Sequence, residues 1–168
     1  MGCITLSFPR PFIKMSMQPR TAPIYRLGAS VSFEPAGAGI KHLSSGWSEP
    51  DSAGFSWSDG PEAELLLGVA TPARDIVCNL DVMPFIVPGM IEQQQIEIFF
   101  NHFRVGYTEL REGRQNLPIY LPKEIFMLRA AVINLHISTA RSPLELGLSA
   151  DRRRLGLALW SLQMVPVQ

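Results

Sequence analysis

The sequence predicts an all-β fold, a two-sheet antiparallel sandwich of the jelly-roll type with about eight strands. Three observations lead to this prediction. Short segments in which apolar and polar residues alternate recur along most of the chain, and this period of two is typical of strands with one buried face. The chain has fourteen prolines and thirteen glycines, mostly between these segments. Helical periodicity is weak, and many short strands separated by turns are typical of a sandwich or barrel.

The alternating pattern begins at Ile24. From Tyr25 to Phe33 every second residue is apolar, which predicts a strand with one buried face. Residues 1–22 are rich in Pro, Met, Ser and basic residues without a sustained period, so we expect a flexible N-terminal arm there. The predicted organisation is therefore an arm at 1–22 and a β-sandwich domain at 23–168.

A long Gly, Ser, Pro and Trp-rich segment covers residues 34–61. Segments of this length without regular structure are uncommon inside a domain and are often functional. Asn101-His102 is expected to form a two-residue hairpin turn, because Asn tolerates a positive φ. A helical turn or two is expected within residues 121–130. The further predicted strands are Glu62 to Val69, Asp75 to Phe85, Gln95 to Phe100, Phe103 to Leu110, Leu117 to Leu121, Ala131 to Ser138 and Leu155 to Val165.

The composition argues against several classes of function. Fifteen basic and fifteen acidic residues cancel, whereas nucleic-acid binding relies on a surplus of Lys and Arg, so no nucleic-acid partner is expected. No apolar stretch approaches the roughly 18 residues that span a bilayer. The first apolar run is interrupted by Pro9 and Pro11 and follows no basic segment, unlike a secretory signal. We expect a soluble, cytoplasmic chain.

Metal and redox chemistry are not indicated either. Cys78 lies in an apolar run, and we expect a buried, reduced thiol there rather than a bridge to Cys3. His42, His102 and His136 have no metal-ligand spacing, and there is no Cys/His cluster. We expect no cofactor and no metal.

The candidate binding residues lie in the segment 34–61. They are Trp47, Glu49, Asp51, Trp57 and Asp59. Sugar sites combine an aromatic platform with carboxylates and amides that accept hydrogen bonds from hydroxyls, and this segment has both rings and carboxylates. The alternative is that both indoles fold inward and close the mouth of the sandwich, an arrangement favoured for Trp57 because a strand follows it directly.

Chemistry at the same residues is less well supported. Glu49 and Asp51 are too close along one loop to flank a scissile glycosidic bond, where the two carboxyl groups lie roughly 5 to 10 Å apart. A calcium site formed with Asp59 would suit the oxygen ligands, but the spacing matches no known calcium loop. There is no G-x-S-x-G motif. We therefore expect no catalytic residues and no enzyme activity.

Two segments of the chain are distinctive: G-W-S-E-P-D-S-A-G-F-S-W-S-D-G at residues 46–60 and S-P-L-E-L-G-L-S-A-D-R-R-R-L-G at residues 142–156. They resemble two motifs of a known module, the galactose-binding-like β-sandwich that is attached to bacterial glycosyltransferases and to other surface-polysaccharide proteins. That module has a G-W-x-x-P-E-x-x-G-x-W-S-x-G stretch and, before its last strand, an S-P-x-x-L-G-x-S-x-D-x-R-x-L-G stretch. Asp51 stands where the module usually has Glu, and its hairpin turn is usually Asn-Gly. The similarity covers about Tyr25 to Met164, and the matching segments here are residues 46–60 and 142–156.

The resemblance implies the jelly-roll fold and a setting in bacterial polysaccharide biosynthesis or glycosyl transfer, without a catalytic transferase domain. The leading hypothesis is a non-catalytic carbohydrate-binding module whose partner is a glycan or a glycosyltransferase. The alternative is a structural or assembly protein that forms oligomers, for example through the apolar run at residues 96–100. A small lyase or hydrolase on the same fold is a third hypothesis, and it lacks a visible catalytic constellation.

Overall fold

The structure is a computed structural model that describes residues 21–168. The prediction of a flexible arm therefore falls, for residues 1–20, outside the described part of the chain. Within the described part there are ten strands and two short 3-10 helices. The strands are β1 (Ser30–Ser32), β2 (Leu43–Ser45), β3 (Ser56–Asp59), β4 (Glu62–Gly68), β5 (Ile76–Pro84), β6 (Gln94–Phe100), β7 (Phe103–Leu110), β8 (Gln115–Leu121), β9 (Ala130–Ile137) and β10 (Leu155–Pro166), and the helices are η1 (Ile40–His42) and η2 (Lys123–Ile125).

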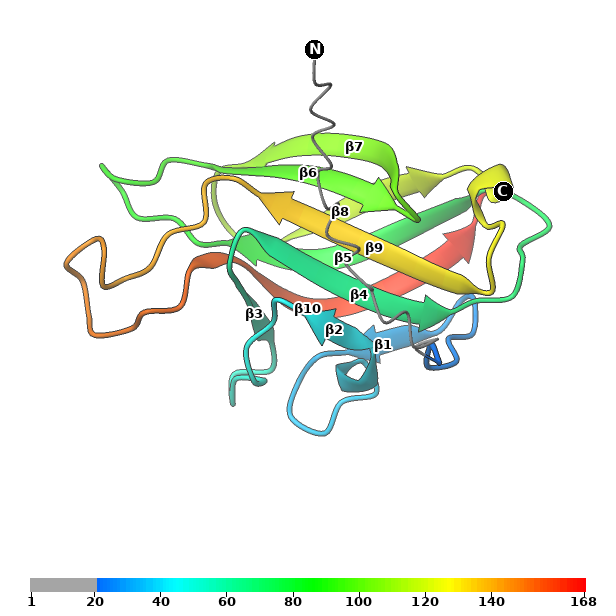
Figure 1. The fold of residues 1–168 in the computed structure, drawn as a ribbon, viewed down its shortest axis with the longest axis horizontal. Coiled ribbons are helices and arrows are strands. Elements are labelled where there is room, and N and C mark those ends of the chain that lie inside the picture. The colour runs from blue at the N-terminus through cyan, green and yellow to red at the C-terminus, as the bar shows by residue number, and fades with distance from the viewer. Residues whose placement is uncertain (1–20) are drawn as a thin grey trace, which may run out of the picture.

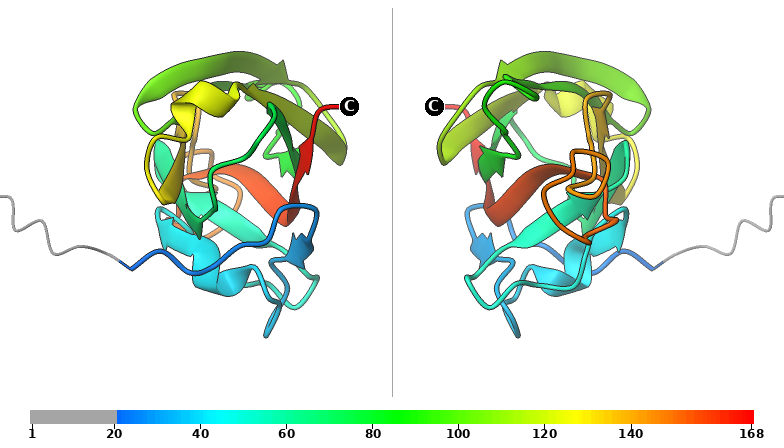
Figure 2. Two further views of the ribbon diagram at one scale, coloured as in Figure 1. Left: turned by 90° about the vertical axis from the view of Figure 1, so that its right-hand side faces the viewer. Right: turned by 90° about the vertical axis from the view of Figure 1, so that its left-hand side faces the viewer.

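The strands form two antiparallel sheets, and the fold is a jelly-roll sandwich (Figure 1). One sheet, called sheet A here, has the order β2-β4-β9-β6-β7. The other, sheet B, has the order β1-β10-β5-β8, and β3 also pairs with β10. Because β1 pairs with Ser161 to Gln163 and β3 pairs with the stretch from Leu155 to Leu159, these two short strands share one side of β10. End-on, the two sheets enclose the core between them (Figure 2).

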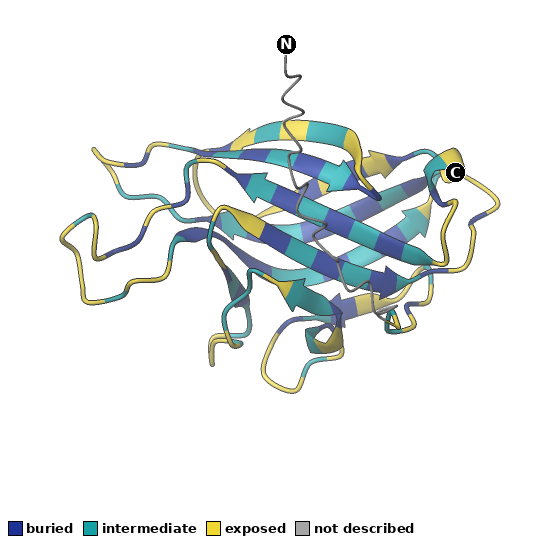
Figure 3. Cartoon of the chain, viewed as in Figure 1, coloured by how far each residue is buried: buried dark blue, intermediate teal, exposed yellow. Residues whose placement is uncertain are grey.

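Alternating burial along the strands confirms the period-two analysis (Figure 3). In β5, β6 and β9 every second side chain is buried and the intervening ones are partly exposed. The buried side chains of both sheets form one apolar cluster, which is the dominant stabilising contribution in such a fold. Its largest fully buried members include Phe33, Phe100, Leu65, Ile96, Leu121, Ile133 and Leu157.

The segment 34–61 is more regular than expected, because β2 and β3 lie within it. The predicted first strand is shorter than expected. Only residues 30–32 are a strand, since Gly28 has a φ of 87° and turns the backbone. The hairpin prediction is confirmed, with φ of 46° at Asn101 and 73° at His102 between β6 and β7. The expected helical turn within residues 121–130 is the 3-10 helix η2.

Candidate functional site

Four aromatic side chains form a continuous strip over sheet B: Phe55, Trp57, Phe85 and Trp160. The Trp57 ring meets Phe55 and Phe85 edge-on, with ring centroids 5.5 Å and 5.9 Å away. Phe55 lies against Trp160 with centroids 4.6 Å apart and planes tilted by 46°. All four rings are partly exposed. Edge-to-face and tilted pairs at these distances are favourable, so the contacts between the rings stabilise the arrangement of the four side chains.

The strip lies on the outer face of sheet B because of the alternation in β3. Ser56 and Ser58 are buried, and the Ser58 hydroxyl accepts hydrogen bonds from the backbone N–H groups of Gly156 and Leu157. The side chain between them, Trp57, therefore points away from the core. Its cross-strand partner Ala158 is fully buried without belonging to the core cluster, which we explain by the rings that cover this part of the sheet.

A β-bulge in β10 places Trp160 in the strip. The core side chains of β10 are Leu157 and Leu159 before the bulge and Leu162 and Met164 after it, so they change from odd to even numbers. The pairing with β5 shifts between Leu159 and Ser161 at the same point. A bulge adds one residue and re-aims a side chain. Trp160 is that residue, and it is partly exposed beside Phe55.

A charged pair continues the strip toward β8. The Arg114 guanidinium lies over the Trp160 ring, 4.6 Å from its centroid, in a cation–π contact. The same guanidinium donates to both carboxylate oxygens of Asp81, with N–O distances of 2.9 Å and 2.5 Å. This bidentate pair fixes the Arg114 plane against the indole. Both charges are partly exposed, so they remain able to bind hydroxyl groups.

Polar side chains lie beside the rings on the outer face of sheet B, opposite one another on neighbouring strands. Asp81 of β5 faces Ser161 on one side and Asn116 on the other. In a further row, Asn79 faces Gln163 of β10, and the Asn116 amide donates to the Asn79 side-chain oxygen at 2.9 Å. The outer face of sheet B thus combines an aromatic strip with amide, carboxylate, hydroxyl and guanidinium groups.

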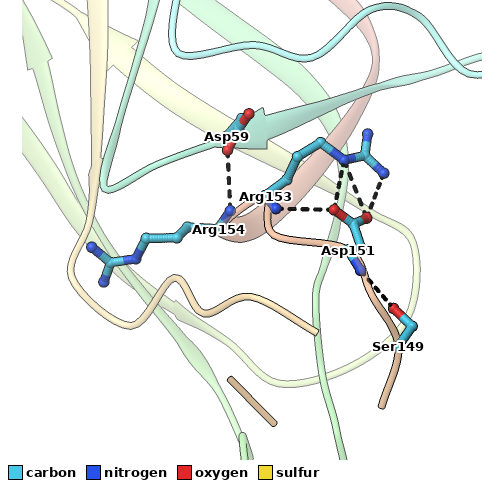
Figure 4. Close-up of polar contacts among 5 residues, drawn as sticks. All are labelled: Asp59, Ser149, Asp151, Arg153 and Arg154. Carbon is cyan, nitrogen blue, oxygen red and sulfur yellow. Dashed lines mark hydrogen bonds and ion pairs between the residues drawn. The ribbon is translucent and has the colours of Figure 1, made fainter. Parts of the chain in front are cut away.

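A hydrogen bond connects the end of β3 to the loop before β10 (Figure 4). The Asp59 carboxylate accepts a hydrogen bond from the backbone N–H of Arg154 at 3.1 Å, which ties β3 to the loop before β10. In that loop the Arg153 guanidinium donates to Oδ1 of Asp151 at 3.1 Å and to Oδ2 at 2.7 Å. These hydrogen bonds lower the pKa of the Asp151 carboxyl below its ordinary value. Asp51 and Asp59 contribute further negative potential at Arg153.

The five residues singled out in the sequence are divided between two environments. Trp57 belongs to the strip, Asp59 lies at the end of the same strand, and the Asp51 backbone N–H donates to the carbonyl of Phe55 at 2.7 Å. Trp47 instead packs against the core and donates its indole N–H to the Glu64 carbonyl at 2.9 Å. Glu49 is exposed and lines a small pocket together with Trp47. The inward arrangement is therefore correct for Trp47 and wrong for Trp57.

Four members of this surface were not predicted from the sequence, namely Phe55, Phe85, Trp160 and Arg114. The sequence of β10 carries one signal for Trp160. The apolar residues of this strand change from odd-numbered to even-numbered positions, and Trp160 lies where the change occurs. No comparable signal exists for Arg114, because its contact with Trp160 depends on the pairing of β8 with β5 and of β5 with β10.

Neither a metal-binding cluster nor a reactive thiol is found among the described residues. No group of three or more His, Cys, Asp or Glu side chains within residues 21–168 has a geometry for a metal ion. Cys78 is a free thiol in the core, and burial raises its pKa to about 12, so it is an unreactive thiol at neutral pH. No helix among the described residues has the length and hydrophobicity that crossing a membrane requires.

Comparisons with known proteins give matches only among solved structures. No protein-family model and no curated protein matches the chain. The chain is similar to a family 35 carbohydrate-binding module from an environmental isolate, at 14% identity and a TM-score of 0.48, covering 81% of this chain and 96% of the module. It is also similar to the CBM36-1 domain of a multidomain xylanase from the hindgut metagenome of Trinervitermes trinervoides, at 9% identity and a TM-score of 0.47, covering 83% and 98%.

A third similar structure is a much larger protein. It is BtGH115A, a family GH115 4-O-methyl-alpha-glucuronidase with specificity for decorated arabinogalactans, matched at 10% identity and a TM-score of 0.46. The match covers 70% of this chain and only 15% of the glucuronidase.

Proposed function

We propose that this protein is a non-catalytic carbohydrate-binding module that holds a glycan against the aromatic strip on sheet B. The observation that carries the proposal is the strip itself, four partly exposed rings in contact with one another on an open sheet face. The two faces of a pyranose ring expose C–H groups, whereas its edges carry hydroxyls. A ligand of this kind needs apolar rings beneath it and hydrogen-bonding groups around it.

The polar groups beside the strip fit the second requirement. Arg114 and Asp81 are held rigidly by their bidentate pair, so they offer donors and acceptors in fixed directions with little loss of side-chain entropy on binding. The Asn116 amide lies beside Asp81 and the Asn79 amide lies in the next row, and both can donate and accept. In this proposal the glycan runs across β3, β10 and β5.

The residues predicted from the sequence have separate roles in the proposal. Trp57 contacts the ligand within the strip, and Asp51 and Asp59 accept hydrogen bonds from hydroxyls at the β3 end. Glu49 is exposed at the edge of the same loop and contributes at most a peripheral contact. Trp47 acts indirectly, because its contacts with the core and with Glu64 fix the loop that leads into β3.

The setting of this activity is also proposed rather than shown. We propose a role in bacterial polysaccharide biosynthesis or glycosyl transfer, in the cytoplasm, with a glycosyltransferase as the protein partner. The support is the resemblance of residues 46–60 and 142–156 to the module described above. Co-purification of a glycosyltransferase with the tagged protein from its native cells would test the partner directly.

A glycan array tests the binding function. We expect the wild-type protein to bind a defined set of glycans and Trp57→Ala to lose at least about tenfold in affinity, as for a central aromatic anchor. Phe103→Ala is the matched control, because it removes an exposed aromatic ring from sheet A. Near-UV circular dichroism of each variant checks the fold. Equal binding by a folded Trp57→Ala protein, or silence of the wild type across the array, would overturn the proposal.

The structure does not favour the assembly alternative in the form suggested by the sequence. Ile96, Ile98 and Phe100 of β6 are at most 3% exposed and belong to the core between the sheets. β6 itself lies inside sheet A, between β9 and β7, so neither its edges nor these three side chains are free for a second subunit.

A further inference from the structure

A shallow pocket of about 380 Å³ lies on sheet A, on the opposite side of the sandwich from the aromatic strip. It follows β9 and is lined by Asn134 and His136 of that strand, with Glu62 of β4 on one side and Phe99 of β6 on the other. His102 of the β6–β7 turn also lines it. Figure 1 faces sheet A, and β9 crosses its centre between β4 and β6. The volume is within the usual range of small-ligand sites, roughly 300 to 1,000 Å³.

The strand register places the lining side chains in two rows on the outer surface. His136 is opposite Glu62 on one neighbouring strand and opposite Glu97 on the other. Asn134 is opposite Glu64 and Phe99 in the same way. Phe99 is partly exposed between the buried Ile98 and Phe100, so its ring faces outward. One aromatic ring therefore lies beside an amide in the centre of the sheet.

Within residues 21–168, three of the four polar side chains that line the pocket have no partner, and the fourth, His136, contacts Glu97. Around the pocket the side chains are engaged: Glu97 pairs with Arg104 at 3.0 Å and with His136 at 3.5 Å, and the Tyr107 hydroxyl donates to Glu109 at 2.8 Å. Within residues 21–168, the side chains of Glu62, His102 and Asn134 make no hydrogen bond or ion pair. Three unengaged polar side chains of this face are thus gathered around Phe99.

We infer that this pocket is a second carbohydrate site, which binds one neutral pyranose unit. This inference rests on the proposed function for the class of ligand, but not on the aromatic strip. The Phe99 ring would cover a C–H face of the sugar, the Asn134 amide would donate to one hydroxyl and accept from another, and Glu62 would accept from a third. Anionic sugars are disfavoured, because Glu62 has no counter-ion while Arg104 is neutralised by Glu97.

Two sites on opposite faces give the molecule a property that one site does not, namely the ability to link two glycan chains. A linker of this kind gains avidity on a multivalent surface without additional contacts. It also predicts that variants on one face leave binding on the other face intact.

NMR titration of the ¹⁵N-labelled protein with methyl β-D-glucopyranoside and methyl β-D-galactopyranoside tests the inference. We expect at least one of these probes to cause saturable shifts of the Asn134 side-chain amide signals. Phe99→Ala should weaken that binding about tenfold or more, and Asn134→Ala should do the same when binding is followed by the backbone amide signals of β9. Tyr107→Phe is the matched control on the same sheet and should have no effect. D-galacturonate should bind at least several-fold more weakly than the neutral galactoside.

The pattern of shifts separates the two proposals. Shifts at Asn134 that persist in Trp57→Ala support the second site. Shifts confined to residues around the strip overturn the second site and leave the proposed function standing. Shifts confined to the pocket support the second site and remove the strip from the proposed function. No saturable shift at Asn134 with either neutral probe, or equal binding of galacturonate, overturns the inference whether or not Phe99→Ala folds.

Discussion

Trp47 and Trp57 lie in the same glycine- and serine-rich segment and have opposite surroundings. Composition alone does not distinguish these two residues, because a tryptophan near the end of a sandwich can either pack in the core or contact a sugar. The distinction comes from hydrogen bonding and strand parity. Trp47 donates to the Glu64 carbonyl and packs on the core, whereas Trp57 sits between two buried serines whose alternation turns it outward. Neither β3 nor the Glu64 contact is visible as a sequence pattern.

Replacing Trp47 tests its structural role. Trp47→Ala removes a partly buried ring and leaves the Glu64 carbonyl without its indole donor. We expect the free energy of unfolding to fall by about 2 kcal/mol, since the ring is not fully buried and full truncations cost roughly 3 to 5 kcal/mol. Urea denaturation measures this directly. Trp47→Phe should recover part of the loss, and an Ala variant of unchanged stability that no longer binds glycan would instead make Trp47 a contact residue.

The buried thiol of Cys78 predicts a loss of stability at alkaline pH. Its pKa in the folded protein is raised from 9.0 to about 12 by burial. An acid with a raised folded pKa stabilises the native state fully below its unfolded pKa, and this contribution is lost as the pH rises toward the folded pKa. Between about pH 8 and pH 10.5 the expected loss is about 2 kcal/mol, at 1.36 kcal/mol for each pH unit above the unfolded pKa.

Comparison with Cys78→Ala isolates that contribution. The variant starts from a lower stability because it creates a small cavity, but its stability should fall less steeply over the same pH range. Tyr25, whose pKa burial also raises, remains in both proteins, and its contribution to the two slopes differs only through its charge interaction with Cys78. Parallel pH profiles for the two proteins would contradict the prediction.

At the scale of elements, the long strands were predictable and the short ones were not. β4 to β10 have enough residues for an alternating pattern to emerge, and the predicted bounds agree with the structure to within two residues. β2 and β3 have three and four residues, embedded among serine and glycine. They are strands because neighbouring β4 and β10 supply backbone partners. Tertiary pairing of this kind leaves no local signal.

Gly46, which precedes Trp47, lies close to the backbone of β4, and this proximity leads to a prediction. Its φ is 72°, and a Cβ there would lie 1.9 Å from the Glu62 carbonyl oxygen. Gly60 also has a positive φ, of 117°, but a Cβ there would meet no atom within 4 Å. Gly46→Ala should therefore cost at least about 3 kcal/mol, whereas Gly60→Ala should cost only backbone strain, about 1 to 3 kcal/mol. Chemical denaturation of both variants compares them, and equal losses would show that the loop yields to the added methyl group.

At the scale of the whole molecule, the sandwich presents two open sheet faces and buries one core. The fold class followed from the sequence because periodicity and turn spacing are properties of the entire chain. The candidate site did not, because its residues come from β3, β5, β10 and the turn before β8, and only the sheet order brings them together. From the sequence, only candidate residues that are close along the chain, such as Trp57 and Asp59, could be predicted to lie together on this surface.

The charge of the whole molecule leads to a final prediction about salt. The formal net charge is zero, and the cation nearest the strip, Arg114, is already paired with Asp81. Binding of a neutral glycan should therefore release few counter-ions and depend on ring contacts and hydrogen bonds. Surface charge interactions are screened beyond about 10 Å at 0.1 M salt and beyond about 3 Å at 1 M. We expect the dissociation constant to change by less than about twofold between these two salt concentrations.

Isothermal titration calorimetry at both concentrations, with a glycan identified on the array, measures this dependence. Phe103→Ala serves again as the control protein, since its charge and its strip are those of the wild type. A tenfold weakening at high salt would mean that the ligand is anionic. The main binding role would then belong to cationic side chains rather than to the rings, and Trp57→Ala should in that case leave the salt dependence intact.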